Sequence, residues 1–188
     1  MPVPTPTVDE LTAKQAITDV IHRYCRAMDR MDRELAMSCW HEGGTDDHSP
    51  LFAGTAEGFV EWVWPVHAGM EVIRHVVSNI LIELDGDEAG AECYWTVTLR
   101  MDKDGDLYDV MGGGRYVDNF ECINGQWAIR HRQSLHDWDI VRKVEATMAT
   151  GEPMLKPNNP EVEPKISARD RTDYSYSVLG KSDRTRSS

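Results

Sequence analysis

Apolar residues near the start of the chain recur at three- and four-residue steps, which is the pattern of one buried helix face. The stripe begins at Leu11 and ends at Met28. Thr7 followed by Glu10 is typical of a capping box, in which a hydroxyl and a carboxylate each satisfy a free backbone amide. The pattern predicts a long helix from about Val8 to about Asp29.

The following stretch is shorter and more mixed. A second helix is predicted over residues 32–40, with a Gly-Gly turn at 43–44 after it. Residues 45–54 have the composition of a loop or a short edge strand. A third helix is expected over residues 55–67, and its end is placed at Pro65, because proline cannot donate the next helical hydrogen bond.

From about residue 72 the pattern changes from helical to extended. Runs rich in β-branched and aromatic residues alternate with turn signals, of which Asn124-Gly125 is the strongest. Glycines 112–114 inside one run predict a bulge or a sharp bend that would help the sheet to curl. The four predicted strands cover residues 72–84, 91–101, 108–123 and 127–141.

Helices followed by a four-strand meander predict an α+β domain in which the helices pack on one face of a strongly curved, mainly antiparallel sheet and enclose a pocket. The composition shifts at about residue 151, where prolines and charges become frequent. We therefore expect one domain over residues 1–150 and a tail over 151–188 without a helical or strand period. Its apolar residues either dock on a neighbouring subunit or belong to a partly mobile tail; they are Tyr174, Tyr176, Val178 and Leu179.

Composition and charge narrow the choice of partners. Of 188 residues, 40% are hydrophobic and six are Trp, which is enough for a core. Lys and Arg number 20 against 32 Asp and Glu, so the net charge is -12. An acidic surface repels phosphate backbones and anionic lipids, so we expect neither nucleic acid nor a membrane as partner. A neutral or aromatic small molecule in a dry pocket remains compatible with this charge.

The chain starts MPVPTPTVDEL, without the basic residues and apolar run of a signal peptide. No stretch approaches the roughly 20 apolar residues that a membrane helix needs. The four cysteines form no close pair, so reduced thiols and a cytoplasmic location are expected. They are Cys25, Cys39, Cys93 and Cys122.

The common catalytic signatures are absent: there is no P-loop, no GxGxxG after a strand, no GxSxG and no HExxH. Asp29 follows the apolar helix stripe, and His75 lies in a strand on the same face as Asn79. If the fold brings them together, Asp29 can orient His75 and stabilise its imidazolium, leaving a general base. Otherwise Asp29 is a solvated helix-end residue and His75 a structural one.

Arg132 lies in the last predicted strand and alternates there with Arg130 and Ser134. Pointing inward it can hold a leaving group or an oxyanion, and pointing outward it merely balances the acidic surface. Aromatic side chains for a pocket are available, although core packing explains most of them equally well. They are Trp40, Trp62, Trp64, Trp95 and Trp138.

A metal site is the competing chemical hypothesis. His41, Asp46, Asp47 and His48 are close in sequence. Their spacing matches no recognised ligand pattern, and loops rich in Asp and His are commonly solvated turns. We therefore expect no metal and no cofactor.

These features together resemble the SnoaL-like branch of the NTF2-like superfamily. The resemblance covers about residues 8–141, although more residues separate Trp64-Pro65 from His75 than it leads us to expect. It rests on Tyr24-x4-Asp29, the Trp40 segment, Trp64-Pro65, His75 with Asn79, and GGGRYVDNFECINGQWAIRHRQ.

The resemblance implies a cone-shaped α+β fold with a pocket between the sheet and the long helix. Polyketide cyclases, steroid isomerases, scytalone dehydratase and gamma-hexachlorocyclohexane dehydrochlorinase belong to this group, and the pattern is most similar to the last two. By that likeness Asp29 is the orienting acid, His75 the base and Arg132 an electrostatic helper. Tyr24 would polarise a carbonyl or a leaving hydroxyl, and Trp40, Trp64, Asn79 and Trp95 would contact substrate.

The sequence thus favours a cofactor-independent lyase for a small hydrophobic, aromatic molecule. Proton abstraction would precede β-elimination of water or loss of a one-carbon fragment such as formaldehyde. The alternatives are an isomerase or cyclase with the same base, and a non-catalytic binding protein. Because both phases of residues 72–84 carry apolar side chains, we also expect a homo-oligomer, a trimer in preference to a dimer.

Overall fold

The long first helix is present as predicted. The computed structural model describes residues 5–145, 161 and 165–179, and α1 spans Val8–Arg30. The capping box forms in both directions between Thr7 and Glu10. The helix ends at Met31 in the left-handed conformation. Its inner face, which is buried against the sheet, carries Ile17, Ile21, Tyr24, Cys25, Ala27 and Met28.

The segment after α1 differs from the prediction. The second helix, α2 (Arg33–Met37), is short, and residues 40–47 form strand β1 (Trp40–Asp47) instead of a helix end and a turn. β1 pairs in parallel with the last strand, and the two glycines lie in an irregular stretch of that pairing, where Gly43 has a φ of 73°. The strand forms because β6, far away in the sequence, supplies its hydrogen bonds. The residue pattern of β1 alone does not predict a strand.

The third helix, α3 (Ala56–Ala68), runs one turn beyond the expected end. Pro65 lies inside it, and the capping residue is Gly69. The extra turn accommodates the residues that separate Trp64-Pro65 from His75. It also brings His67, which a helix ending at Pro65 would have left outside, to a buried position.

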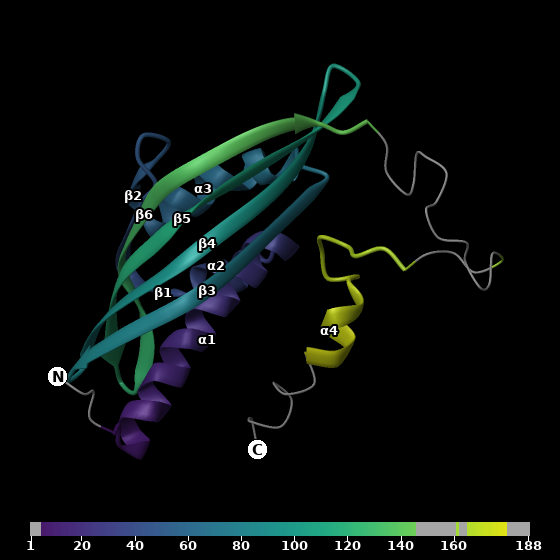
Figure 1. Cartoon of the computed structure of the whole chain (residues 1–188). Helices are drawn as coiled ribbons and strands as arrows, with labels where there is room; N and C mark the ends of the chain where they lie inside the picture. The colour runs from purple at the N-terminus through teal and green to yellow at the C-terminus, as the bar shows by residue number, and fades with distance from the viewer. Residues whose placement is uncertain (1–4, 146–160, 162–164, 180–188) are drawn as a thin grey trace.

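One sheet of six strands carries the rest of the fold (Figure 1). Its order is β2-β1-β6-β5-β4-β3, and only the β1–β6 pair is parallel. The strands after α3 are longer than predicted but in the predicted order, joined by tight turns. Beyond β1 they are β2 (Ala53–Thr55), β3 (Val72–Asp85), β4 (Glu88–Lys103), β5 (Asp106–Ile123) and β6 (Gln126–Lys143).

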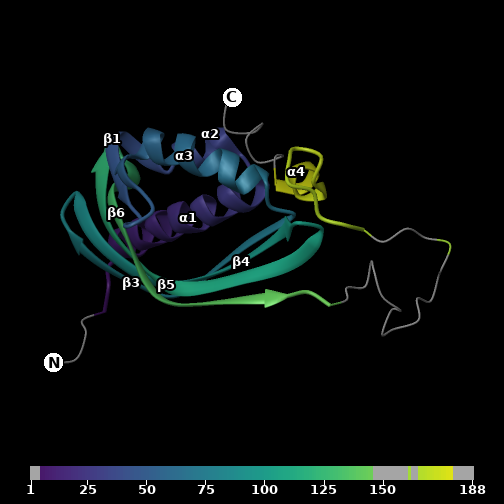
Figure 2. The ribbon, with the colours of Figure 1, turned by 90° about the horizontal axis from the view of Figure 1, so that it is seen from above.

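The long strands bend around α1 and α3, so that the helices lie in the hollow of the sheet (Figure 2). The predicted irregularity at the glycines is confirmed, because the β5–β6 register shifts between Gly113 and Gly114. A Cβ on Gly113 would lie 2.4 Å from Nε1 of Trp138, and one on Gly114 would lie 1.9 Å from the carbonyl oxygen of Leu135. The indole of Trp138 therefore leaves room only for glycine at position 113, and the close approach of the Leu135 backbone does so at position 114.

The sheet and the helices enclose one core, and this arrangement confirms the α+β cone. Among the described residues no helix is long and apolar enough to cross a bilayer. The C-terminal region contains a short helix that the sequence did not predict, α4 (Tyr174–Leu179), which lies beside the end of α1. The proposed domain boundary near residue 150 falls outside the described residues.

The glycines of β5 give a direct test of the fold. We expect Gly114→Ala to lower the free energy of unfolding by about 1–3 kcal/mol, because the added methyl group overlaps backbone that cannot move independently. Gly90→Ala, in β4 with nothing within 4 Å of its Cβ position, is the matched control and should change stability by about 0.5 kcal/mol or less. Urea unfolding measures both. Equal stabilities of the two variants would contradict the close approach.

Candidate active site

A cavity of about 190 Å³ lies between α1, α3 and the inner face of the sheet. Its walls are mainly aromatic and aliphatic, including Phe59, Trp62 and Trp95. Three histidines also line it: His48, His67 and His75. Two larger hollows, of about 490 and 480 Å³, lie elsewhere and contain none of these histidines. This largely apolar cavity, which several histidines line, is the candidate site.

Asp29 and His75 lie in contact, which is the arrangement in which Asp29 can orient the His75 ring. Nδ1 of His75 lies 2.7 Å from Oδ1 of Asp29, and the side chains are 8% and 15% exposed. The backbone amide of His75 also donates to this carboxylate, at 3.0 Å to Oδ1 and 3.2 Å to Oδ2. One carboxylate thus holds both the ring and the strand that carries it.

The contact fixes the form of the imidazole. A carboxylate only accepts hydrogen bonds, so Nδ1 of His75 must donate, and in the neutral ring Nε2 keeps its lone pair. Because His75 lines the cavity, this nitrogen is the one that a bound molecule meets. The arrangement is that of a general base whose tautomer is set by a neighbouring carboxylate.

Arg132 is completely buried and does not line the cavity. Its guanidinium donates to both oxygens of Asp118, at 2.8 Å and 2.6 Å, and lies 4.1 Å from the ring centres of Tyr24 and Tyr116. The two tyrosines separate it from the cavity, which they line. Arg132 therefore lies across these rings from the cavity and is not one of its lining residues, whereas direct contact was expected.

A second irregularity explains why Arg130 and Arg132 do not share a face. The β5–β6 register shifts between Asn119 and Phe120, which leaves Arg130 as the additional residue of β6. Arg130 is exposed and pairs with Glu121 at 3.0 Å. The bulge separates a surface ion pair from a buried one two residues away.

The two phenols keep their protons. Burial raises the pKa of Tyr24 and of Tyr116, and the charge of Arg132 opposes this effect without reversing it. Near neutral pH both side chains are therefore hydrogen-bond donors. Tyr24 is the one that lies edge-on to His75, with the ring centres 6.5 Å apart.

His67 supplies a neutral imidazole. Burial above all lowers the pKa of His67 to about 3, and a proton on the neighbouring His75 adds to the effect. Its ring centre lies 6.3 Å from that of His75, and its buried Nδ1 has no partner among the described residues. No sequence motif marks this residue, which lies at the end of the helix expected over residues 55–67. Its position beside His75 of β3 depends on tertiary packing.

His48 and Asp46 form a second pair, which the sequence analysis considered only as metal ligands or as a solvated turn. Nδ1 of His48 contacts Oδ1 of Asp46, whose side chain is 0% exposed. The sequence signal for this pair is the spacing of Asp46 and His48, because the side chains of residues i and i+2 in an extended chain point to the same side. In the described part of the chain, no three His, Cys, Asp or Glu side chains are grouped to hold a metal ion.

Of the predicted contact residues, only Trp95 lines the cavity. Trp62 takes the place expected for Trp64, because residues two apart on a helix face different directions. Trp40 packs edge-on against Tyr24 in the core, with ring centres 5.4 Å apart. Asn79 is exposed at a bulge of β3, where its φ is 54°. These three positions are corrections to the predicted site.

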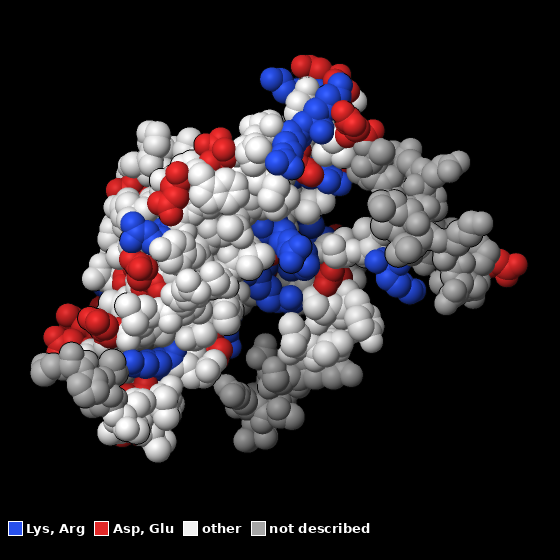
Figure 3. All heavy atoms as spheres, viewed as in Figure 1, with Lys and Arg blue, Asp and Glu red and all other residues white. Residues whose placement is uncertain are grey.

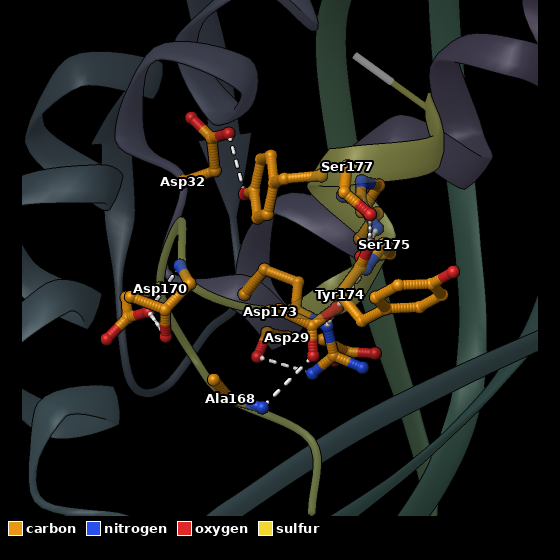
Figure 4. A network of polar contacts seen from close by, with 12 residues as sticks. Asp29, Asp32, Ala168, Asp170, Asp173, Tyr174, Ser175 and Ser177 are labelled. Atoms are coloured by element: carbon orange, nitrogen blue, oxygen red, sulfur yellow. Dashed lines mark hydrogen bonds and ion pairs between the residues drawn. The ribbon is translucent and has the colours of Figure 1, made fainter. Parts of the chain in front are cut away.

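The C-terminal segment packs near Asp29, at the C-terminal end of α1, through polar contacts (Figure 4). The hydroxyl of Tyr176 donates to Asp32 at 2.8 Å, and Asp173 faces Arg30 at 3.9 Å. Arg169 donates to the carbonyl oxygens of Met70 and His67 at the end of α3. Tyr176, predicted to dock on another subunit or to be mobile, thus contacts its own chain.

The fold and the site define an α+β cone of the NTF2-like type, with a histidine-lined pocket. The family model described as a SnoaL-like domain matches residues 9–133. The chain therefore belongs to the SnoaL-like family, as the sequence motifs indicated. Among curated proteins, none matches closely enough to show a relationship.

Several solved structures share the fold. A variant of Rv3472 from Mycobacterium tuberculosis, of unknown function, is 25% identical over 71% of this chain and 76% of its own, with a TM-score of 0.60. A proposed scytalone dehydratase from Novosphingobium aromaticivorans is 19% identical over 79% and 97%, with a TM-score of 0.62. The hexachlorocyclohexane dehydrochlorinase LinA-type3 from Novosphingobium barchaimii is 14% identical over 80% and 99%, with a TM-score of 0.64.

The buried neutral His67 predicts acid sensitivity. The unfolded chain binds a proton there near the ordinary pKa of 6.5, whereas the folded chain does so only near pH 3. Between these values the unfolded state holds more protons, so the free energy of unfolding falls as the pH is lowered, by up to about 1.4 kcal/mol per pH unit. His67→Gln should flatten this slope.

Urea unfolding across the same pH window measures the slope, and His22→Gln, at an exposed position of α1, is the control. The comparison uses slopes, so a uniform loss of stability in either variant does not affect it. Identical slopes for the native chain and His67→Gln would contradict a buried, neutral His67.

Proposed function

We propose that the protein is a cofactor-independent lyase that removes a proton from a small, hydrophobic, aromatic molecule and eliminates a β-substituent. The single observation that supports this most is the free Nε2 of His75, whose ring Asp29 orients toward an apolar cavity. Structures of the same fold include enzymes named for dehydration and dehydrochlorination. Their low identity supports the fold, and the argument for chemistry rests on the pair itself.

Each step has a group in the cavity. Nε2 of His75 takes the proton from a carbon next to a carbonyl, and Asp29 stabilises the imidazolium that results. Tyr24, kept protonated by burial, donates to the carbonyl oxygen as negative charge develops there. In β-elimination the carbon–oxygen bond then breaks, and the oxygen leaves as water once it has taken up a proton. In the retro-aldol variant Nε2 of His75 instead takes the proton of the β-hydroxyl, the Cα–Cβ bond breaks to leave an enolate, and formaldehyde departs. Arg132 is a positioning residue that supports Tyr24 from behind.

The cavity indicates the size and class of the substrate. An engineered apolar cavity of about 150 Å³ binds benzene, so about 190 Å³ holds one aromatic ring with a short side chain. Trp62 and Trp95 offer ring surfaces for stacking or edge contacts. The polar groups that line it are histidines, hydroxyls and the indole N–H groups of the tryptophans, with no Asp, Glu, Lys or Arg among the lining residues. A neutral substrate therefore fits better than a charged one.

His75→Gln and Asp29→Asn test the base. We expect each to lower turnover of a β-hydroxy ketone by about 10²–10⁴-fold, because a positioned general base contributes a factor of that size. Asparagine keeps an acceptor for the amide of His75 but removes the charge that supports imidazolium. Turnover per folded molecule and melting curves are measured together, with His22→Gln as control.

The outcome separates the alternatives. Near-native turnover in both folded variants would end the proposal of an Asp29–His75 base. Exchange of substrate hydrogen with deuterated water without loss of any group would favour an isomerase or cyclase. Tight binding of aromatic molecules with neither exchange nor turnover would favour a binding protein.

We also propose that the protein is a homotrimer that associates through the outer face of the sheet. The bulge in β3 places Leu81 with Val76 on this face. Figure 3 shows uncharged surface between scattered acidic and basic groups, and the net charge of the chain is -12. Exposed apolar residues on the face are Val76, Leu81, Tyr94, Met111 and Val117. A reducing, cytoplasmic location fits the four free cysteines.

Light scattering at micromolar concentration should give the mass of a trimer. Val117→Lys should reduce it to the monomer mass, because a charge in an apolar interface is costly. Val8→Lys is the control, since Val8 is 77% exposed at the start of α1, away from the sheet face. A monomer mass for the native chain would rule the assembly out.

A further inference from the structure

The second carboxylate–histidine pair of the cavity has no role in the proton abstraction described above. His48 follows β1 directly, and its Nδ1 contacts Oδ1 of Asp46. Its ring stacks on Phe59 with the centres 4.6 Å apart and the planes at 12°. These two contacts fix the ring orientation, and His48 lines the same cavity as His75.

Burying the carboxylate of Asp46 costs free energy unless a positive charge on His48 compensates it. Its side chain is 0% exposed, and Oδ2 has no hydrogen-bond partner among the described residues. Leaving a buried charged group partly without hydrogen-bond partners destabilises the folded state. A positive charge on His48 offsets that cost, so the carboxylate stabilises the ring in the form that can donate a proton from Nε2.

The two pairs belong to different parts of the cavity wall. His75 lies on β3, which is one edge strand of the sheet. His48 directly follows the last residue of β1, which belongs to the opposite half of the sheet. The two tyrosines join them, since Tyr24 contacts His75 and Tyr116 contacts His48, with ring centres 6.5 and 6.1 Å apart. A molecule in the cavity can therefore meet one histidine at each side.

We propose that His48, held by Asp46, is the general acid that protonates the leaving group, while His75 is the base. This inference rests on the proposed lyase function and adds its second proton-transfer group. His75 takes the carbon-bound proton, and the electron pair forms the new double bond. The carbon–oxygen bond breaks, and the oxygen leaves as water with the proton from Nε2 of His48. Solvent then returns a proton to His48 and removes one from His75.

A pair of substrates that differ only in the leaving group tests the assignment. The aldol of acetone and benzaldehyde loses water to give benzylideneacetone, whereas its analogue with chlorine in place of the hydroxyl loses chloride, which needs no proton. We expect His48→Gln to lower elimination from the aldol by about 10²–10⁴-fold but to leave the chloride within about threefold of the native rate. His75→Gln should slow both, because each reaction begins with the same proton transfer.

His131→Gln is the matched control. Its Nδ1 contacts the hydroxyl of Thr45 at 2.8 Å, and it does not line the cavity, so both rates should stay near native. Asp46→Asn should reproduce the substrate-dependent loss of His48→Gln in its folded fraction. Hydrogen–deuterium exchange of the aldol, recorded beside elimination, should persist in His48→Gln and disappear in His75→Gln.

Failure of the lyase proposal and failure of the general-acid assignment give different results. If the native chain neither exchanges nor eliminates either compound, the lyase proposal fails as a whole. If the native chain is active and His48→Gln slows both compounds equally, or slows neither, only the general-acid assignment is overturned.

Discussion

A single buried cation holds the fold and the site together. The guanidinium of Arg132 is 0% exposed, pairs with both oxygens of Asp118 and lies between the rings of Tyr24 and Tyr116. Removing one member of such a pair typically costs about 3–5 kcal/mol, because the other charge stays buried, and each desolvated cation–π contact adds up to about 2 kcal/mol. The contact joins α1 to β5 and β6, so the position of the helix on the sheet depends on it.

Fixing Tyr24 also fixes the end of α1, where the carboxylate of Asp29 meets β3. That carboxylate accepts hydrogen bonds from the backbone amide and the ring of His75, so it holds both the edge strand β3 and the orientation of the imidazole. Around this point the cavity holds imidazoles in different surroundings: two beside carboxylates, and His67, which burial keeps neutral.

Features that depend on local pattern were predicted from the sequence. The capping box, the apolar face of α1, the order of the long strands and the irregularity at glycines 112–114 were predicted, and so was the possible approach of Asp29 to His75. Features set by distant partners were not. β1 has no apolar alternation and forms by pairing with β6. The bulge that exposes Asn79 and the burial of Arg132 behind two rings likewise follow from neighbours far away in the chain.

The central claim is that Asp29 holds neutral His75 with its proton on Nδ1, so that Nε2 faces the cavity as a base. NMR of the histidine ring nitrogens in nitrogen-15-labelled protein measures this directly. The signals of His75 are assigned by their loss in His75→Gln. The account predicts one neutral tautomer at His75, protonated at Nδ1, in the native chain, and a mixture in Asp29→Asn. A native His75 with its proton on Nε2, or a tautomer unchanged in Asp29→Asn, would contradict it.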